Sequence, residues 1–286
     1  MLARRWAVLL LTLPTGCVAG PDRPATSAAR PTPDRAAAVV FCADGAGGLG
    51  ETTDTLAHVI AEEGVPLRVE RVEWSHGAGR FMLDHLDWRN LQLKGEGLAR
   101  EARQWQTRSP GSRICFVGQS AGCAAVLLAA EAMPADSVDR VVLLAPSLSS
   151  RYDLRPALRA TREGIDVFYS ERDWFVLGLG MALSGTTDGH LPPVAGRVGF
   201  RRVVANSSDE ALYARLRQHP WDPEVEQTGH TGGHYGALEA GHVRARILPM
   251  LAPNRRAGLG QIRGPAGRTR FRSPPRGHLG GDQAGG

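Results

Sequence analysis

The sequence predicts an α/β fold, with a mostly parallel sheet covered by helices on both faces. Between residues 37 and 251, short apolar runs rich in β-branched residues alternate with longer segments of helical periodicity. The runs are apolar throughout, which is typical of strands that are covered on both faces. A segment of this length is enough to bury one core but short for two, so we expect a single domain over 37–251.

The two ends of the chain lack this pattern. Residues 1–17 combine Arg4 and Arg5 with an apolar run and a small-residue cleavage site, which is typical of an export signal. Gly16 and Cys17 resemble a bacterial lipoprotein signal, so we expect a periplasmic or cell-surface protein anchored through a lipidated Cys17. Plain secretion and an uncleaved cytoplasmic start are the alternatives. Residues 18–36 predict a flexible tether, and residues 252–286 a disordered Arg/Gly/Pro-rich tail.

The net charge of +5 does not favour nucleic-acid binding. Seven arginines lie in the last 35 residues, so the predicted domain itself is close to neutral. Cys42, Cys115 and Cys123 fall in apolar or alanine-rich runs and are expected to be buried free thiols. A disulfide between Cys42 and Cys115 is the alternative.

Five apolar runs are predicted as strands, at residues 38–43, 67–73, 113–117, 140–144 and 165–169. Helical periodicity predicts six helices between and after them. The predicted helices cover residues 52–63, 90–108, 121–132, 155–162, 210–218 and about 235–248. Residues 174–200, with several glycines and Pro192-Pro193, carry no pattern that assigns them.

A GxSxG motif at residues 118–122 places Ser120 between a predicted strand and a predicted helix. A nucleophile elbow requires this strand, turn and helix, because it presents the serine hydroxyl on a strained turn. Gly118 and Gly122 leave room for the helix to approach the strand. This context indicates that Ser120 is a nucleophile rather than part of a structural turn.

A second glycine-rich turn, at residues 44–48, follows the first predicted strand and precedes a helix. Acyl transfer needs N–H donors for the oxyanion, one after the nucleophile and one from such an early loop. By position, these donors are the amides of Ala121 and Ala46. The glycine spacing fits neither GxGxxG nor the Walker pattern, so a nucleotide loop is not favoured.

The order of glycine-rich loop, GxSxG elbow, acidic residue and histidine resembles that of the α/β-hydrolase superfamily of serine esterases, lipases and peptidases. The resemblance covers about residues 39–248 and implies a compact α/β-hydrolase fold. No long helical lid is expected, because the stretch between Pro146 and Ile165 is short. The family order implies an acid in the loop after strand 165–169, where Asp173 is the expected residue and Asp188 the reserve candidate.

The same resemblance implies a catalytic histidine in the loop before the last helix. His234 stands immediately before that helix and is the expected base, with His230 as the reserve candidate. Their four-residue spacing also suits a metal site, but glycines lie between them and no HExxH motif or third ligand is evident. We expect no metal and no cofactor.

These residues predict a serine hydrolase that cleaves a small-molecule or lipid-derived carboxylic ester through an acyl-enzyme. A serine peptidase or acyltransferase would use the same triad, and a non-catalytic binding lipoprotein could keep the same fold. The triad does not determine the leaving group. Five residues are candidates for an apolar acyl pocket or for ordinary core, namely Trp74, Trp174, Phe175, Leu177 and Leu179.

Overall fold

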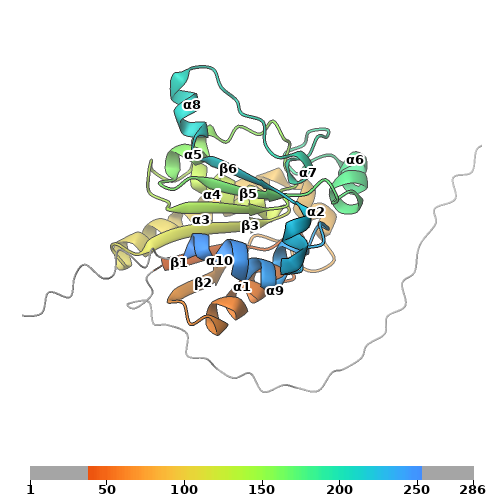
Figure 1. The fold of residues 1–286 in the computed structure, drawn as a ribbon. Coiled ribbons are helices and arrows are strands. Elements are labelled where there is room, and N and C mark those ends of the chain that lie inside the picture. Colours follow the sequence, from red (N-terminus) through yellow and green to blue (C-terminus); the bar gives the residue numbers. More distant parts are fainter. Residues whose placement is uncertain (1–37, 253–286) are drawn as a thin grey trace, which may run out of the picture. The chain divides into compact units, whose positions relative to one another are not determined.

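The computed structural model describes residues 38–252, so the predicted signal, tether and, apart from Ala252, the predicted tail lie outside the described residues. The described residues form a parallel sheet in the order β2-β1-β3-β4-β5-β6, which confirms the predicted fold class (Figure 1). The strands are β1 (Ala38–Ala43), β2 (Leu67–Arg71), β3 (Arg113–Gln119), β4 (Arg140–Leu144), β5 (Ile165–Tyr169) and β6 (Leu216–Pro220).

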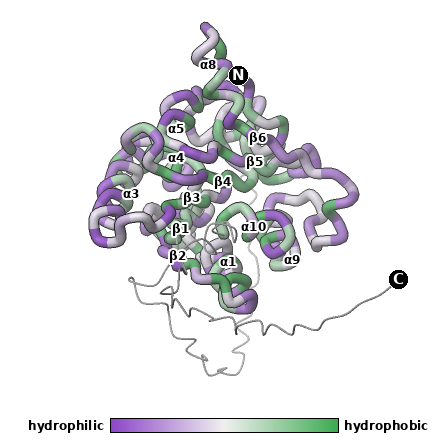
Figure 2. The backbone as a smooth tube through the Cα atoms, turned by 60° about the vertical axis from the view of Figure 1, so that its left-hand side comes forward, coloured by the Kyte–Doolittle hydropathy of each residue, from purple (hydrophilic) through white to green (hydrophobic). Residues whose placement is uncertain are grey.

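Alternate residues of β1 face opposite layers of the fold. Val39 and Phe41 belong to the core beneath α3 and α4, whereas Val40 and Cys42 belong to the core beneath α1 and the C-terminal helices. Figure 1 shows α1, α9 and α10 on one face of the sheet. In Figure 2 the helix α3 alternates between hydrophobic and hydrophilic residues, as expected of a helix with one buried side.

The helical segments are of very different lengths. Among residues 38–252, none is both long and apolar enough to cross a membrane. Their bounds are α1 (Glu51–Glu62), α2 (Phe81–Leu86), α3 (Trp88–Arg108), α4 (Gly122–Glu131), α5 (Arg155–Ala160), η2 (Phe175–Gly180), α6 (Met181–Ser184), α7 (Ala195–Val198), α8 (Ser207–Tyr213), η3 (Pro223–Thr228), η4 (Gly236–Leu238), α9 (Ala240–His242), η5 (Val243–Ile247) and α10 (Leu248–Leu251).

Two of the helix predictions are wrong in part. The predicted helix 210–218 is the end of α8 followed by the edge strand β6. The predicted last helix is interrupted at Glu239, which adopts φ −57° and ψ 131°, outside the helical region. From Ala240 to Leu251 the chain is helical without a break, as α9, η5 and α10. The strands β1, β4 and β5 have the predicted bounds, and the other predicted helices and strands are present with their ends shifted by one or two residues. Helix α2 was not predicted.

The three cysteines of the described residues are free and buried, as predicted, and the alternative bridge between Cys42 and Cys115 is wrong. Burial raises the pKa of each of these two thiols to about 12. Cys123 is also buried, and burial raises its pKa. All three therefore stay protonated at neutral pH and act as small apolar side chains.

A buried carboxylate joins β5 to both neighbouring strands. Asp166 has a fully buried side chain and bonds Arg140 on β4 at 2.5 Å and Arg217 and His219 on β6 at 2.8 and 2.9 Å. Burial alone would raise the pKa of Asp166, but the bonds from His219 and Arg217 outweigh it and hold the pKa well below its usual range. The edge strand is thus attached to the sheet by charge as well as by backbone bonds.

We expect Asp166→Ala to lower the free energy of unfolding by about 3 kcal/mol, because it removes the buried carboxylate that pairs with Arg140 and Arg217. The loss should be largest above the unfolded-state pKa of about 3.9, and it should shrink as the pH falls toward the lower folded-state pKa. Urea unfolding at neutral and acidic pH measures it. Asp54→Ala is the control, since Asp54 pairs with Arg71 at an exposed site and its loss should cost about 1 kcal/mol or less. Equal losses in both variants would contradict the expectation.

Candidate active site

Ser120 lies on a strained turn at the carboxyl end of β3. Its backbone φ is +53°, in the left-handed region that residues other than glycine rarely adopt. The turn is held by a hydrogen bond from the Ser120 amide to the Leu144 carbonyl on β4, at 2.9 Å. Such strain persists only where the surroundings impose it, and it presents the Ser120 side chain at the cleft.

The glycines on either side of Ser120 are required by packing. A Cβ at Gly118 would lie 2.8 Å from the Cα of Cys123, inside α4. A Cβ at Gly122 would lie 2.3 Å from the carbonyl oxygen of Asp44, at the end of β1. Helix α4 therefore approaches both β1 and β3 more closely than any larger residue would allow, as the motif predicted.

The sheet changes its winding direction between β1 and β3. From β1 the chain crosses to β2 on one side, and β3 then lies on the other side of β1. Ligands of open parallel sheets bind at the carboxyl ends of the strands at such a switch point. Residues 44–48 and Ser120 follow β1 and β3 at this point.

Asp173 and His234, which are 61 residues apart in the sequence, form a buried pair. Nδ1 of His234 lies 2.6 Å from Oδ2 of Asp173. Asp173 is 3% exposed and His234 is 7% exposed. A carboxylate only accepts, so Nδ1 of His234 carries the proton and Nε2 keeps its lone pair. This tautomer is the one that a general base requires.

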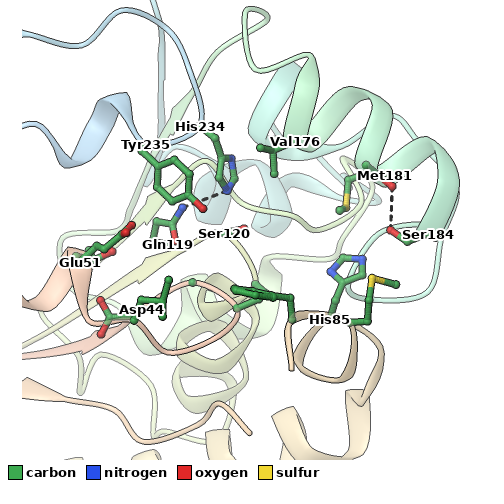
Figure 3. Close-up of a pocket in the computed structure, with 18 of the residues that line it drawn as sticks. Asp44, Glu51, His85, Gln119, Ser120, Val176, Met181, Ser184, His234 and Tyr235 are labelled. Carbon is green, nitrogen blue, oxygen red and sulfur yellow. Dashed lines mark hydrogen bonds between the residues drawn. The ribbon is translucent and has the colours of Figure 1, made fainter. Parts of the chain in front are cut away.

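In the structure, the Gln119 side chain is hydrogen-bonded to Nε2 of His234, the nitrogen that a base would use. Its side-chain Nε2 lies 3.2 Å from Nε2 of His234, and the amide donates to the ring nitrogen (Figure 3). Gly45 makes room for the Gln119 side chain, since a Cβ there would lie 2.1 Å from its Oε1. Among the described residues, the structure records no hydrogen bond from the Ser120 hydroxyl to His234.

The two expected oxyanion donors are free in the part of the chain that the structure describes. No acceptor is recorded for the amide of Ala121, which caps the start of α4, or for the amide of Ala46. The neighbouring amides of Gly47 and Gly48 are both occupied, by Asp84 and by the Gly45 carbonyl. Free amides beside a strained serine suit a developing negative charge.

Ser120 and His234 line a cleft of about 810 Å³ (Figure 3). Its rim carries apolar side chains that are unusually open to solvent, among them Phe175 at 67% and Leu183 at 82% exposed. Apolar side chains gathered at a cleft favour a ligand with an apolar part. The exposed apolar residues of the cleft are Leu49, Phe81, Met82, Leu86, Phe175, Leu183 and Tyr235.

The acyl-pocket candidates divide between the cleft and the core. Phe175 lines the cleft, whereas Leu177 is buried with Met181 and Val194 in a small separate cluster. Trp174 is exposed and packs edge to face on Phe175.

His85 connects two walls of the cleft, a role that the sequence does not signal. Its Nε2 donates to the Gly185 carbonyl at 2.9 Å, so a neutral ring accepts at Nδ1 from the Thr187 hydroxyl at 3.0 Å. The Thr187 hydroxyl also lies 2.6 Å from that of Ser147. These bonds hold α2 against the loop that follows α6.

The two reserve candidates lie elsewhere. Asp188 accepts from the Ser149 amide at 2.8 Å and pairs with His190, which is not a residue of the cleft. His230 faces a small cavity of about 160 Å³ behind β6, and burial lowers its pKa to about 4. Neither residue lines the cleft of Ser120.

No group of three or more histidine, cysteine, aspartate or glutamate side chains suited to a metal is found among residues 38–252.

Comparison with known proteins gives only distant similarities. No family model and no curated protein matches the chain. Three similar solved structures are the esterase PE8, the poly(3-hydroxybutyrate) depolymerase LpqC from Bordetella parapertussis and the Pyrococcus furiosus esterase Pf2001. They are 14%, 12% and 9% identical, with TM-scores of 0.45, 0.45 and 0.44. The matches cover 76%, 79% and 76% of this chain and 93%, 84% and 83% of the other. What the protein does is thus to be inferred from the geometry of its own site.

Proposed function

We propose that this protein is a serine hydrolase that cleaves carboxylic esters with an apolar acyl group. The observation that carries the proposal is the buried pair of Asp173 and His234, at 2.6 Å, in the same cleft as Ser120 on its strained turn. An acid, a correctly protonated imidazole and a serine hydroxyl in one cleft are the components of acyl transfer through an acyl-enzyme.

In the first step, the Ser120 oxygen attacks the ester carbonyl and its proton passes to Nε2 of His234. Asp173 accepts from Nδ1 throughout and stabilises the charge that the ring acquires. Since Gln119 donates to Nε2 in the structure, its amide has to turn away before Ser120 can use the base. The amides of Ala46 and Ala121 bind the oxyanion, and the protonated ring then donates to the leaving alcohol. In the second step a water, deprotonated by His234, releases the acid.

The cleft supports an apolar acyl group rather than a charged substrate. Its rim is formed mainly by apolar side chains, and the acidic residues of its walls, Asp44 and Glu51, lie together on one side (Figure 3). The carboxylate of Asp44 is itself occupied by the amide and hydroxyl of Thr53. A peptide backbone would bring many polar groups to walls with few partners for them.

We expect kcat/KM for p-nitrophenyl esters to rise from acetyl to medium-length acyl groups, by at most about fourfold per CH₂, since each buried CH₂ contributes about 0.8 kcal/mol. Leu183→Ser should flatten this rise. Leu191→Ser is the matched control, because Leu191 is equally exposed, at 79%, but does not line the cleft. Preferred cleavage of a peptide panel would refute the ester assignment, and no dependence on chain length would refute the apolar cleft.

We also propose that the protein is exported and anchored through Cys17, because residues 1–17 have the pattern of a lipoprotein signal. Mass spectrometry of the mature N-terminus tests this proposal. A mature chain that begins beyond Cys17 would contradict it.

A further inference from the structure

Helix α2 lies directly against the glycine-rich loop that follows β1. Gly47, in this loop, has φ +90°, and a Cβ there would lie 2.4 Å from the ring of Phe81 on α2. The loop and the helix are therefore in close contact at a position where only glycine fits.

Asp84, on the same helix, holds this loop by a buried carboxylate. Its side chain is fully buried, and Oδ2 accepts from the Gly47 amide and from the Ser75 hydroxyl, each at 2.6 Å. Oδ1 accepts from the amide of His76 at 2.6 Å and lies 2.8 Å from Nδ1 of its ring. One carboxylate thus joins three segments of the chain, the glycine-rich loop, α2 and residues 75–76.

These contacts keep Asp84 ionised. Burial alone would raise the pKa of Asp84, but the bonds from His76, Ser75 and Gly47 outweigh it and lower the pKa. Hydrogen bonds to a charged acceptor are about twice as strong as neutral ones, so the loop is firmly held.

The bond to Gly47 has a geometric consequence for Ala46. The Gly47 N–H belongs to the peptide unit on the carboxyl side of Ala46, and Asp84 holds this unit. The Gly45 carbonyl belongs to the unit that carries the Ala46 N–H, and it accepts from the Gly48 amide at 3.1 Å. Ala46 therefore lies between two peptide units that are both held, and its own N–H has no recorded acceptor among the described residues.

We propose that Asp84 is a positioning residue, which fixes the glycine-rich loop so that the Ala46 amide is directed at the oxyanion. This inference rests on the proposed function, since it requires an oxyanion to form at Ser120. Asp84 does not line the cleft, and its bond to the Gly47 amide is its hydrogen bond to the glycine-rich loop. The role predicts an effect on the transition state with little effect on substrate binding.

The test compares Asp84→Ala and Asp84→Asn with the wild type, on a p-nitrophenyl ester. We expect kcat to fall about 10- to 100-fold in Asp84→Ala with KM little changed, somewhat less than the 10²- to 10³-fold cost of removing an oxyanion donor outright. Affinity for a trifluoromethyl ketone, which forms an oxyanion on the serine, should fall by a similar factor. Asp84→Asn should be partly rescued, because its carboxamide oxygen can still accept from Gly47.

Two further variants separate positioning from a general loss of structure. Ser75→Ala removes another bond to the same oxygen but leaves the Gly47 contact, so it should change kcat much less. Glu96→Gln removes a charge from the exposed face of α3 and should leave kcat unchanged. If Asp84→Ala does not fold, Asp84→Asn and its ketone affinity decide the question.

A lower melting temperature with normal kcat and normal ketone affinity in the Asp84 variants would overturn the proposal while leaving the proposed function intact. A rise in KM with unchanged ketone affinity would also overturn it, because it would place the effect in the cleft wall. A wild-type protein that neither hydrolyses esters nor binds the ketone would overturn the proposed function, and this inference with it.

Discussion

Ser120→Ala will abolish ester hydrolysis and labelling by a fluorophosphonate. The expected fall in kcat is about 10⁴-fold or more, because removal of the nucleophile leaves only binding and the oxyanion donors. The reason is the elbow, where φ +53° and the bond from the Ser120 amide to Leu144 present the Ser120 hydroxyl to the cleft. Alanine adopts this φ no worse than serine does, so the variant should remain folded. Turnover, labelling and thermal unfolding measured on the same preparation test all three statements.

Ser184→Ala is the control for specific labelling. Ser184 also lines the cleft, but its hydroxyl donates to the Gly180 carbonyl at 3.0 Å, and no hydrogen bond from it to a histidine is found among the described residues. This variant should be labelled like the wild type. If Ser120→Ala were still labelled and Ser184→Ala were not, the nucleophile would have been assigned to the wrong serine.

The apolar runs of the sequence predicted the central strands, because nearly all residues of these strands are buried. β1, β4 and β5 have the predicted bounds, since each is mostly apolar, apart from Arg140 and Asp166, and lies between two neighbouring strands. β6 was not predicted, because it is an edge strand with polar residues at Arg217 and His219. Their partner, Asp166, is 51 and 53 residues away in the sequence. A local sequence pattern therefore cannot predict this pairing.

Helix α2 escaped prediction for a related reason. Its apolar residues Phe81, Met82 and Leu86 are exposed at the cleft, whereas its polar residues Asp84 and His85 are buried. This arrangement inverts the usual pattern of apolar residues inside and charged residues outside. Such inversions are expected where a segment serves a site rather than the core.

The parts of the candidate site that could be predicted are those given by the sequence motif and by the order of residues along the chain. Ser120 could be found from the elbow, and the structure brings Asp173 and His234 together as the expected order implies. Gln119 stands within the motif, but only the fold brings its side chain to His234. Asp84 carries no sequence signal at all, because its partners Gly47, Ser75 and His76 become neighbours only through folding.

His234→Ala is expected to lower kcat by about 10³-fold or more, whereas His230→Ala should leave kcat nearly unchanged. A general base must reach the serine hydroxyl. His234 lines the cleft with Ser120 and is oriented by Asp173, while His230 lies in a different cavity, packed edge to face on His242. Ester turnover of both variants, measured after each is shown to be folded, separates the two roles.

His230→Ala should instead affect stability. Nδ1 of His230 accepts from the Gly232 amide, so its loss leaves a buried donor unpaired at a cost of about 1–3 kcal/mol. Because burial holds the folded-state pKa at about 4, below the unfolded value of about 6.5, the unfolded state binds more protons between these values. This contribution of His230 to stability is therefore complete above about pH 6.5 and declines as the pH falls toward 4. A dead His230→Ala enzyme beside a normal His234→Ala enzyme, both folded at neutral pH, would exchange the two assignments, because stability alone cannot remove turnover from a protein that remains folded.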